Sequence, residues 1–193
     1  MFILYPLVIA LIVGLLVGGS IVPLGHLHFR WPAVALLSLG VQLLIFSTPV
    51  GDLLGGVAPF AYIASTFATL LFVLSNIALP GFPLVAVGAA SNLVAIVANG
   101  GFMPTTPDAL AALGKHLGAG YSNSMTSANV LLAPLTDVFA MPRGLPLANV
   151  FSVGDVLIGA GVFVFILAVM RRPVDRLPRL VVPVGGAPPQ AGV

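Results

Sequence analysis

Long stretches without a charged residue constrain the fold of this chain more than any other feature of its sequence. Between Asp52 and Asp108 lie 55 consecutive residues, and none of them is charged. One helical pass through a bilayer core needs about 20 apolar residues, so this stretch is long enough for two passes and too long for one. A Pro-Gly pair at 80–81 marks the break, because Pro removes a backbone donor and Gly permits a tight turn. The sequence therefore predicts transmembrane helices over about 57–78 and 83–98.

Three further apolar stretches have the length of a membrane span. The first covers 2–22 and lacks the positive charge that precedes the apolar core of a signal peptide. The second covers 31–50 and the third covers 151–170. Over the whole chain 59% of residues are hydrophobic and 6% are charged, whereas about a quarter of a soluble domain is charged. We therefore expect an all-α integral membrane bundle of about five transmembrane helices, built as a single domain over 1–172.

Two segments fall outside these apolar stretches. The segment 99–149 is the long polar connection before the last span, and Thr106 followed by Pro107 inside it is typical of a helix start. Leucines then recur on one face, which predicts a short helix lying in the membrane interface. The segment 173–193 is rich in Pro and Gly, so we expect a flexible tail.

Basic residues predict the orientation of the bundle. Four of the seven follow the last apolar stretch, at Arg171, Arg172, Arg176 and Arg179. If that cluster is cytoplasmic, an odd number of spans places Arg30 on the same side and leaves Lys115 and Arg143 outside, as the positive-inside rule requires. The N-terminus and the loop 99–149 then face outward, and the tail is cytoplasmic. Because the basic residues report membrane topology, we expect no nucleic-acid partner.

Two aspartates at the outer face are the candidates for chemistry. Asp155 lies just inside the last apolar stretch, where a carboxylate costs roughly 2.5–3.5 kcal/mol at the bilayer centre and less near the interface. Asp137 lies in the outer loop between apolar residues. Two carboxyl groups close together in a low-dielectric pocket share one proton, and such a pair can act as base and acid on a peptide bond. Each also has a structural alternative, because Ser152 and Asp155 have the spacing of a capping box and Asp137 suits a solvated turn.

Amide and hydroxyl side chains are the candidates for supporting this pair. Asn92 lies inside the fourth apolar stretch, where it either joins helices or orients a carboxylate, and Asn99 opens a Gly-rich turn that can help to line a pocket. Ser152 is the third supporting residue. His26 and His28 are a poor metal site, because no thiolate or carboxylate lies near them in the sequence. We expect no metal and no cofactor.

The first apolar stretch also suggests a contact between helices. Gly14 and Gly18 place two bare backbone patches on one helix face, which favours close approach of another helix. We therefore expect the lipid bilayer as the main partner, with a helix–helix oligomer or a complex subunit docking through these glycines as a further possibility.

Three motifs in chain order resemble an uncharacterised bacterial family of multipass membrane proteins. They are Asn-Gly-Gly-Phe-Met-Pro at 99–104, Leu-Thr-Asp-Val at 135–138 and Phe-Ser-Val-Gly-Asp-Val-Leu-Ile at 151–158. That family is described as a domain of unknown function. The resemblance implies a bacterial plasma-membrane protein and implies no activity.

The C-terminal half is also similar, more distantly, to lipoprotein signal peptidase, an aspartyl peptidase that cuts within the membrane. The segments 88–92, 136–138 and 151–158 resemble its Gly-rich, Val-Asp-Phe and Phe-Asn-x-Ala-Asp motifs. The resemblance implies that Asp137 and Asp155 are catalytic and that the substrate is a membrane-anchored peptide or lipid. The sequence departs from the pattern at Ser152, Gly154 and 93–94, where that family has Asn, Ala and Asp-Arg.

Two classes of function therefore remain open. One is a membrane-embedded aspartyl hydrolase with an outward-facing Asp pair. The other is a non-enzymatic membrane module, such as a small transporter, a lipid-binding protein or an assembly subunit, in which the aspartates are structural. The sequence does not decide whether the chain is an enzyme.

Overall fold

The computed structural model describes residues 2–114, 124–125 and 129–173, and most of these are helical. Five helices are long: α1 (Leu4–Leu16), α2 (Pro32–Ser47), α4 (Ala58–Ser75), α5 (Phe82–Ala98) and α7 (Val153–Met170). The short helices are α3 (Val50–Leu54), α6 (Pro107–Leu113) and three 3₁₀ turns, η1 (Val22–His26), η2 (Gly55–Val57) and η3 (Ala133–Leu135).

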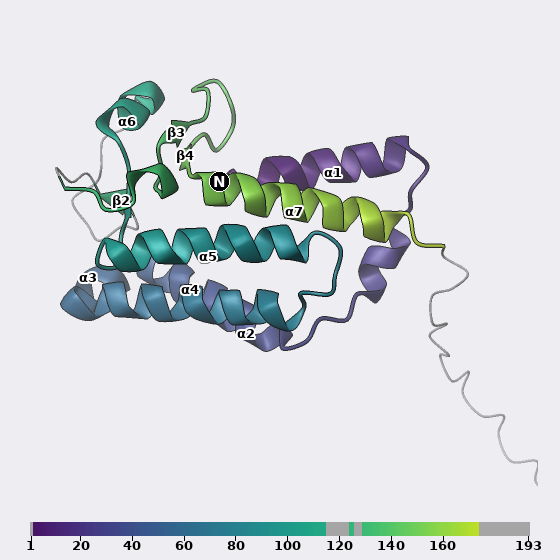
Figure 1. Ribbon diagram of the computed structural model, residues 1–193, viewed down its shortest axis with the longest axis horizontal. Coiled ribbons are helices and arrows are strands. Elements are labelled where there is room, and N and C mark those ends of the chain that lie inside the picture. The colour runs from purple at the N-terminus through teal and green to yellow at the C-terminus, as the bar shows by residue number, and fades with distance from the viewer. Residues whose placement is uncertain (1, 115–123, 126–128, 174–193) are drawn as a thin grey trace, which may run out of the picture.

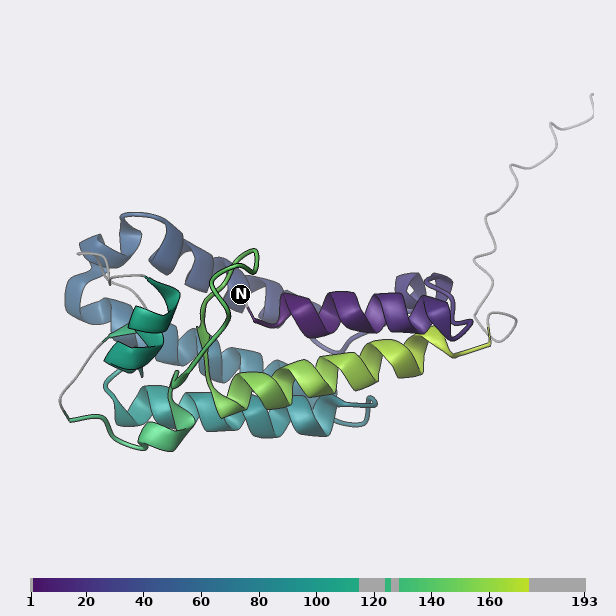
Figure 2. The ribbon, with the colours of Figure 1, turned by 90° about the horizontal axis from the view of Figure 1, so that it is seen from above.

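The long helices lie side by side in a row (Figure 1). Helix α1 packs on α7, α7 on α5, α5 on α4 and α4 on α2, so the order in space is α1, α7, α5, α4, α2. The row is curved, because side chains from α2, α4, α5 and α7 line one common cavity. Seen from above, the chain between α5 and α7 gathers at one end of the row (Figure 2).

All five predicted helices are present, each within a few residues of the predicted range. Two helical segments, Val50–Ser75 and α7, have the length and apolar composition of a membrane span, while the other three apolar helices have 10–17 residues. The expectation of an all-α chain is correct only in part, because the loop before α7 contains two small sheets. In them β1 (Met103–Pro104) pairs in parallel with β2 (Ser124–Met125), and β3 (Phe139–Ala140) pairs antiparallel with β4 (Val150–Phe151).

Helix α1 is shorter than the uncharged stretch that predicts it. It ends at Leu16, because Gly18 adopts a left-handed φ of 80° and the chain then turns into η1. Gly14 is buried and faces Met170 of α7 within the same chain. Gly18 lies beyond the helix, and a Cβ there would meet nothing within 4 Å. Association between copies through these two glycines stays a prediction.

Local signals in the loop between α5 and α7 position α6 as the sequence predicts. The Thr106 hydroxyl accepts a hydrogen bond from the Ala109 backbone N–H at 3.2 Å, and Pro107 occupies the first helical position. Gly114 ends the helix with a φ of 66°. The remainder of the predicted leucine face and the predicted tail after Pro173 lie outside the described residues.

Helices α5 and α7 meet backbone to backbone at two glycine pairs. A Cβ at Gly161 would lie 2.5 Å from the Gly81 carbonyl oxygen, and a Cβ at Gly154 would lie 2.7 Å from the Gly88 carbonyl oxygen. Such separations leave no room for a side chain on either helix. This close approach brings the polar residues of the two helices within hydrogen-bonding distance.

Candidate functional site

Asp155 is held at the start of α7 by a capping box. The Ser152 hydroxyl accepts a hydrogen bond from the Asp155 backbone N–H at 3.0 Å, and the Ser152 backbone N–H donates to Asp155 Oδ2 at 3.2 Å. The predicted capping role of this pair is therefore confirmed. It satisfies two of the N–H groups that the first turn of a helix leaves without a partner.

Asn92 connects this cap to α5. Its Nδ2 donates to Asp155 Oδ1 at 2.8 Å, and its Oδ1 accepts from the buried Ser152 hydroxyl at 2.8 Å. Both predicted roles of Asn92 are thus combined, since the amide joins two helices and also orients a carboxylate. The carboxylate of Asp155 receives one N–H donor on each oxygen, which holds it in a single orientation.

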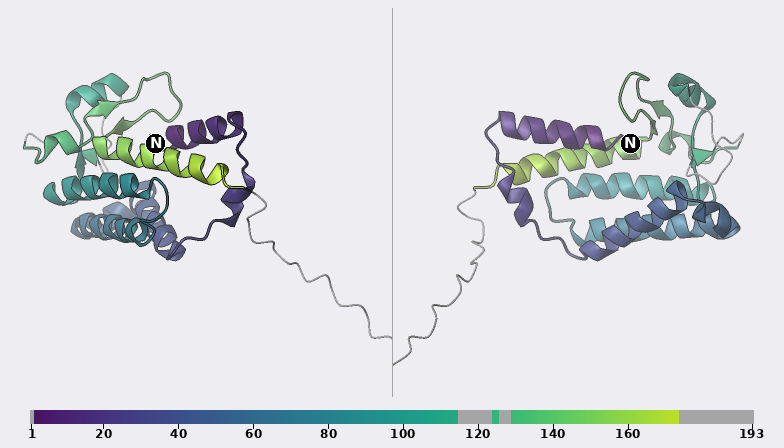
Figure 3. Two further views of the ribbon diagram at one scale, coloured as in Figure 1. Left: turned by 45° about the vertical axis from the view of Figure 1, so that its right-hand side comes forward. Right: turned by 180° about the vertical axis from the view of Figure 1, so that it is seen from behind.

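Two backbone pairings hold the loop before α7, which lies against the start of that helix (Figure 3). Thr105 and Asp137 form an isolated bridge, in which the Asp137 N–H donates to Pro104 at 3.0 Å and the Thr105 hydroxyl donates to the Asp137 carbonyl at 3.0 Å. Two residues later β3 begins and pairs with β4, with Phe139 opposite Phe151. Continuing that antiparallel register places Asp137 across from the first turn of α7.

The Asp137 side chain is only 6% exposed, and its carboxyl group accepts no hydrogen bond from the described part of the chain. Burial raises the pKa of Asp137 from 3.8 to about 7, and the negative charge of Asp155 contributes in the same direction. The two carboxyl groups are therefore electrostatically coupled. Asp137 holds its proton to near-neutral pH. Each carboxyl oxygen of Asp155, in contrast, accepts a hydrogen bond from an N–H donor.

The two carboxyl groups thus have different surroundings, since Asp137 is buried and each oxygen of Asp155 accepts a hydrogen bond. Pairs whose surroundings differ in this way supply the acid and the base of acid–base catalysis. The same contacts also suit a purely structural role for Asp155, because its bonds with Ser152 stabilise the start of α7 and its bond with Asn92 joins α7 to α5. Hydrogen bonds thus bring Asn92, Ser152 and Asp155 together, and Asp137 lies near enough for the charge of Asp155 to raise its pKa.

Within the described part of the chain, Asn99 has no hydrogen bond to this group and instead binds the backbone of the loop that leads to Asp137. Its Nδ2 donates to the carbonyls of Ala95 and Leu131 at 2.8 and 2.9 Å, and its Oδ1 accepts from the Leu131 N–H at 3.0 Å. The side chain caps the end of α5 and pairs with the backbone just before η3. Asn99 is thus a positioning residue for the segment that leads to Asp137.

Replacing Asn99 by Ala is expected to loosen this segment. Each lost hydrogen bond that leaves a part-buried partner costs about 1–3 kcal/mol. Hydrogen exchange at the Thr136 and Asp137 amides should therefore accelerate by at least about tenfold. The matched control is Asn76→Ala, which removes an amide side chain with four hydrogen bonds away from this loop. Equal exchange at Asp137 in wild type and Asn99→Ala would contradict this role.

A polar cavity of about 320 Å³ opens beside Asp155 on the concave side of the helix row. Sequence reasoning identified two of its polar residues, Asn92 and Asp155, and missed four others: Gln42, Tyr62, Thr66 and Thr69. Gln42 was detectable, because it is an amide within the uncharged stretch 31–50. The two threonines carry no signal of their own, because Thr is common in apolar helices.

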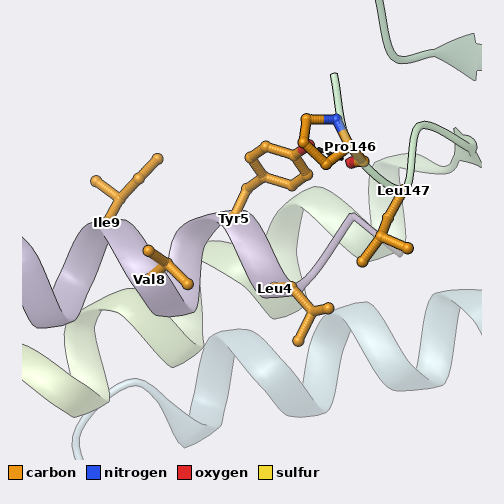
Figure 4. A pocket seen from close by; sticks show the side chains of 6 residues that line it. All are labelled: Leu4, Tyr5, Val8, Ile9, Pro146 and Leu147. Atoms are coloured by element: carbon orange, nitrogen blue, oxygen red, sulfur yellow. Dashed lines mark hydrogen bonds between the residues drawn. The ribbon is translucent and has the colours of Figure 1, made fainter. Parts of the chain in front are cut away.

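A second hollow of about 310 Å³ lies between the start of α1 and the loop before β4 (Figure 4). The Tyr5 hydroxyl donates to the Pro146 carbonyl and ties the loop to the helix, and Leu147 extends beside Leu4. The surface is almost entirely apolar. It offers no acid, base or nucleophile, so it is not part of the candidate site.

The histidines are involved in local backbone contacts. The His26 ring hydrogen-bonds the Val22 carbonyl at 3.1 Å, and the His28 ring hydrogen-bonds the His26 carbonyl at 3.0 Å. Across residues 2–114, 124–125 and 129–173, no three His, Asp, Glu or Cys side chains form a group that could hold a metal ion.

Comparison with known proteins places the chain in a family. Residues 26–167 match the model of a family of unknown function, DUF5317, and this segment is well over half of the chain. The chain belongs to this family. The matched DUF5317 segment contains Gln42, Asn92, Asp137 and Asp155, so both the carboxyl pair and the cavity lie within it.

One relative among curated proteins is an uncharacterised protein of Thermotoga maritima. It is 38% identical over 96 residues, which cover 49% of this chain and 55% of the relative. The chain therefore spans about half the length of that relative. No solved structure matches the chain.

Proposed function

We propose that this chain is a multi-pass bacterial plasma-membrane protein whose outward-facing carboxyl pair, Asp137 and Asp155, hydrolyses an amide bond at the membrane surface. The observation that carries the proposal is the contrast between the two groups. Asp137 is buried without a donor among the described residues, while each oxygen of Asp155 receives an N–H donor. Acid and base roles follow from that contrast.

A membrane setting is supported by the surface of the helices. Only 28% of the residues in the 18-residue apolar window of Val50–Ser75 and 33% of those in α7 are buried. Large apolar side chains face outward along the row, including Leu36 and Phe60, each 71% exposed. The core helix of a soluble protein would bury such side chains, whereas hydrocarbon is a favourable surrounding for them.

The helix directions support five passes with the termini on opposite sides. Arg30 lies in the chain before α2, where the Asn76 side chain binds its backbone, and Arg171 follows α7. The start of α2 and the end of α7 lie toward the same end of the row (Figure 1). Arg143 lies at the other end, where it binds carbonyls at the end of α6. By the positive-inside rule the arginine-rich end is cytoplasmic, and the carboxyl pair faces outward.

The proposed reaction adds one water molecule across an amide bond. Ionised Asp155 takes a proton from water as the water oxygen bonds to the carbonyl carbon, and protonated Asp137 gives its proton to the carbonyl oxygen. The resulting diol collapses as Asp155 passes its proton to the leaving nitrogen and the C–N bond breaks. One diol hydroxyl returns a proton to Asp137, so both carboxyl groups recover their starting states.

The test uses the full-length protein in lipid nanodiscs and a pool of quenched fluorescent transmembrane peptides with varied residues at the outer interface. We expect cleavage at a rate that falls as pH rises through about 7, because Asp137 then loses its proton. Asp137→Asn and Asp155→Asn should each lower the rate by about a hundredfold or more.

Asp108→Asn is the matched control, since Asp108 is an exposed aspartate in the same loop. It should cleave at the wild-type rate. A wild-type protein that leaves the entire pool intact would contradict the proposal, as would Asp137→Asn and Asp155→Asn proteins that cleave normally.

A non-enzymatic membrane module, such as a small transporter, a lipid-binding protein or an assembly subunit, is the second candidate. The complete capping box favours it, because Asp155 already has a structural role in stabilising the start of α7. In that case Asp155→Asn lowers the free energy of unfolding and the wild-type protein cleaves no peptide in the pool.

A further inference from the structure

The polar cavity beside Asp155 presents hydrogen-bond acceptors from several helices. Its walls come from α2, α4, α5 and α7. Leu39 at its edge is 52% exposed, so the cavity opens on the surface of the protein. Its volume of about 320 Å³ lies in the range of small-molecule sites, which start near 300 Å³. A dehydrated metal ion would leave most of this space empty.

The two threonines of α4 offer lone pairs and no protons to the cavity. The Thr66 hydroxyl donates to the Tyr62 carbonyl at 2.9 Å, and the Thr69 hydroxyl donates to the Ser65 carbonyl at 3.0 Å. A hydroxyl has one proton to donate and two lone pairs. Both protons are therefore used within α4, and the lining oxygens of Thr66 and Thr69 are left as acceptors.

Gln42 and Asp155 complete the polar lining from the neighbouring helices. The Gln42 side chain forms no hydrogen bond with the described residues, so its carbonyl oxygen is available to a ligand. Asp155 accepts one bond on each oxygen and keeps further lone pairs, because a carboxylate has about four acceptor positions. No Lys, Arg or His is among the residues that line the cavity.

We propose that this cavity binds a primary ammonium group, with Asp155 as its counter-ion and Gln42, Thr66 and Thr69 as hydrogen-bond acceptors. An ammonium group has three donors and no acceptor, which complements the oxygens of Gln42, Thr66 and Thr69 and the carboxylate. The two N–H donors that Asp155 receives are neutral, and no cation is among the residues that line the cavity, so an ammonium ligand would supply the counter-charge. The remaining apolar walls, among them Leu39 and Ile158, accommodate the carbon chain of the ligand.

This inference goes beyond the proposed hydrolysis, because binding requires Asp155 and the cavity but no turnover. The two ideas therefore fail separately. A wild-type protein that binds the ammonium probe and cleaves no peptide would support the cavity and contradict the hydrolysis.

The experiment measures the thermal unfolding of the full-length protein in phosphatidylcholine nanodiscs with three probes. They are n-octylammonium, n-octyltrimethylammonium and n-octanol, which share one chain and differ in charge and donors. A ligand that binds only the folded state raises its unfolding temperature. We expect n-octylammonium to bind about tenfold or more tightly than either other probe, because only its headgroup combines charge with N–H donors. Equal effects of all three probes would overturn the proposal.

Variants locate the site. Thr66→Val combined with Thr69→Val keeps the shape of both side chains and removes both acceptors, so n-octylammonium should bind about tenfold more weakly. Gln42→Leu should act in the same direction. Ser38→Ala is the control, because its hydroxyl also donates within its own helix, to Val34 at 2.7 Å, but lies outside this cavity. Wild-type affinity in both cavity variants would exclude this site.

Two further comparisons of thermal stability identify the source of the ammonium group. Stabilisation by phosphatidylethanolamine over phosphatidylcholine with the same acyl chains would assign a lipid headgroup. Stabilisation by a transmembrane peptide with one lysine near the outer interface, over the same peptide with norleucine, would assign a peptide side chain. Both results support the ammonium site.

Discussion

Asp137→Asn is expected to make the folded protein more stable at pH 8 by an amount on the order of 4 kcal/mol. The pKa of Asp137 rises from 3.8 to about 7 on folding, so the folded state binds more protons than the unfolded state between these values. The free energy of unfolding of the wild-type protein therefore decreases as pH rises from about 4 to about 7, and stays low above that. Asn is neutral and similar in shape, so the variant avoids this loss.

The measurement is reversible unfolding in mixed micelles at pH 4, 6 and 8. The difference between variant and wild type should be small at pH 4, where Asp137 is protonated in the folded state and half-protonated in the unfolded state, and should grow up to pH 8. Asp108→Asn should show no such gain, because Asp108 is exposed. Parallel pH profiles for wild type and Asp137→Asn would show that Asp137 is not buried in this way.

A gain in stability together with a loss of cleavage would also bear on function. Natural proteins keep a destabilising buried acid where activity needs it, so a stabilising substitution that removes activity identifies a functional residue. A solvated turn aspartate, the structural alternative for Asp137, would give neither effect.

Gly161→Ala is expected to separate α5 from α7. The added Cβ would lie 2.5 Å from the Gly81 carbonyl oxygen and 2.6 Å from a methyl group of Val85, and the first of these is backbone that cannot rotate away. Overpacking of this kind costs roughly 1–3 kcal/mol, and we expect the upper end because two backbones are in contact. The Asn92–Asp155 hydrogen bond joins the same two helices, so its 2.8 Å separation should lengthen as well.

Gly40→Ala is the matched control, and it should stabilise the folded protein where Gly161→Ala destabilises it. Gly40 lies inside α2, and a Cβ there meets nothing within 4 Å. Ala in a helix interior is favoured over Gly by about 1 kcal/mol. The free energy of unfolding, measured by denaturant titration in micelles, should therefore be higher for Gly40→Ala than for wild type and lower for Gly161→Ala. A Gly161→Ala protein as stable as wild type would show that the two helices are not packed this closely.

Features encoded by neighbouring residues were predictable from the sequence. The capping box depends on Ser152 and Asp155, which are three residues apart, and the start of α6 depends on Thr106 and Pro107. The positions of the five long helices follow from apolar stretches of membrane-spanning length. Their exact ends do not, as α1 shows, because a glycine can end a helix while the surrounding residues remain apolar.

Contacts between distant segments needed the tertiary structure. Asn92 and Asp155 are 63 residues apart, and they bond because glycines let α5 and α7 approach at the required register. The coupling of Asp137 to Asp155 depends in the same way on the pairing of β3 with β4, strands of two residues each that have no detectable sequence pattern.

The sequence by itself thus determined which segments are helical and which residues cap them, because these properties arise from hydrophobic length and from hydrogen bonds within one turn. The tertiary structure alone decided which polar side chains meet, and so which carboxyl group keeps a proton and which threonines face a cavity. The physical reason is that burial and charge coupling depend on distances through space, which spacing along the chain does not specify.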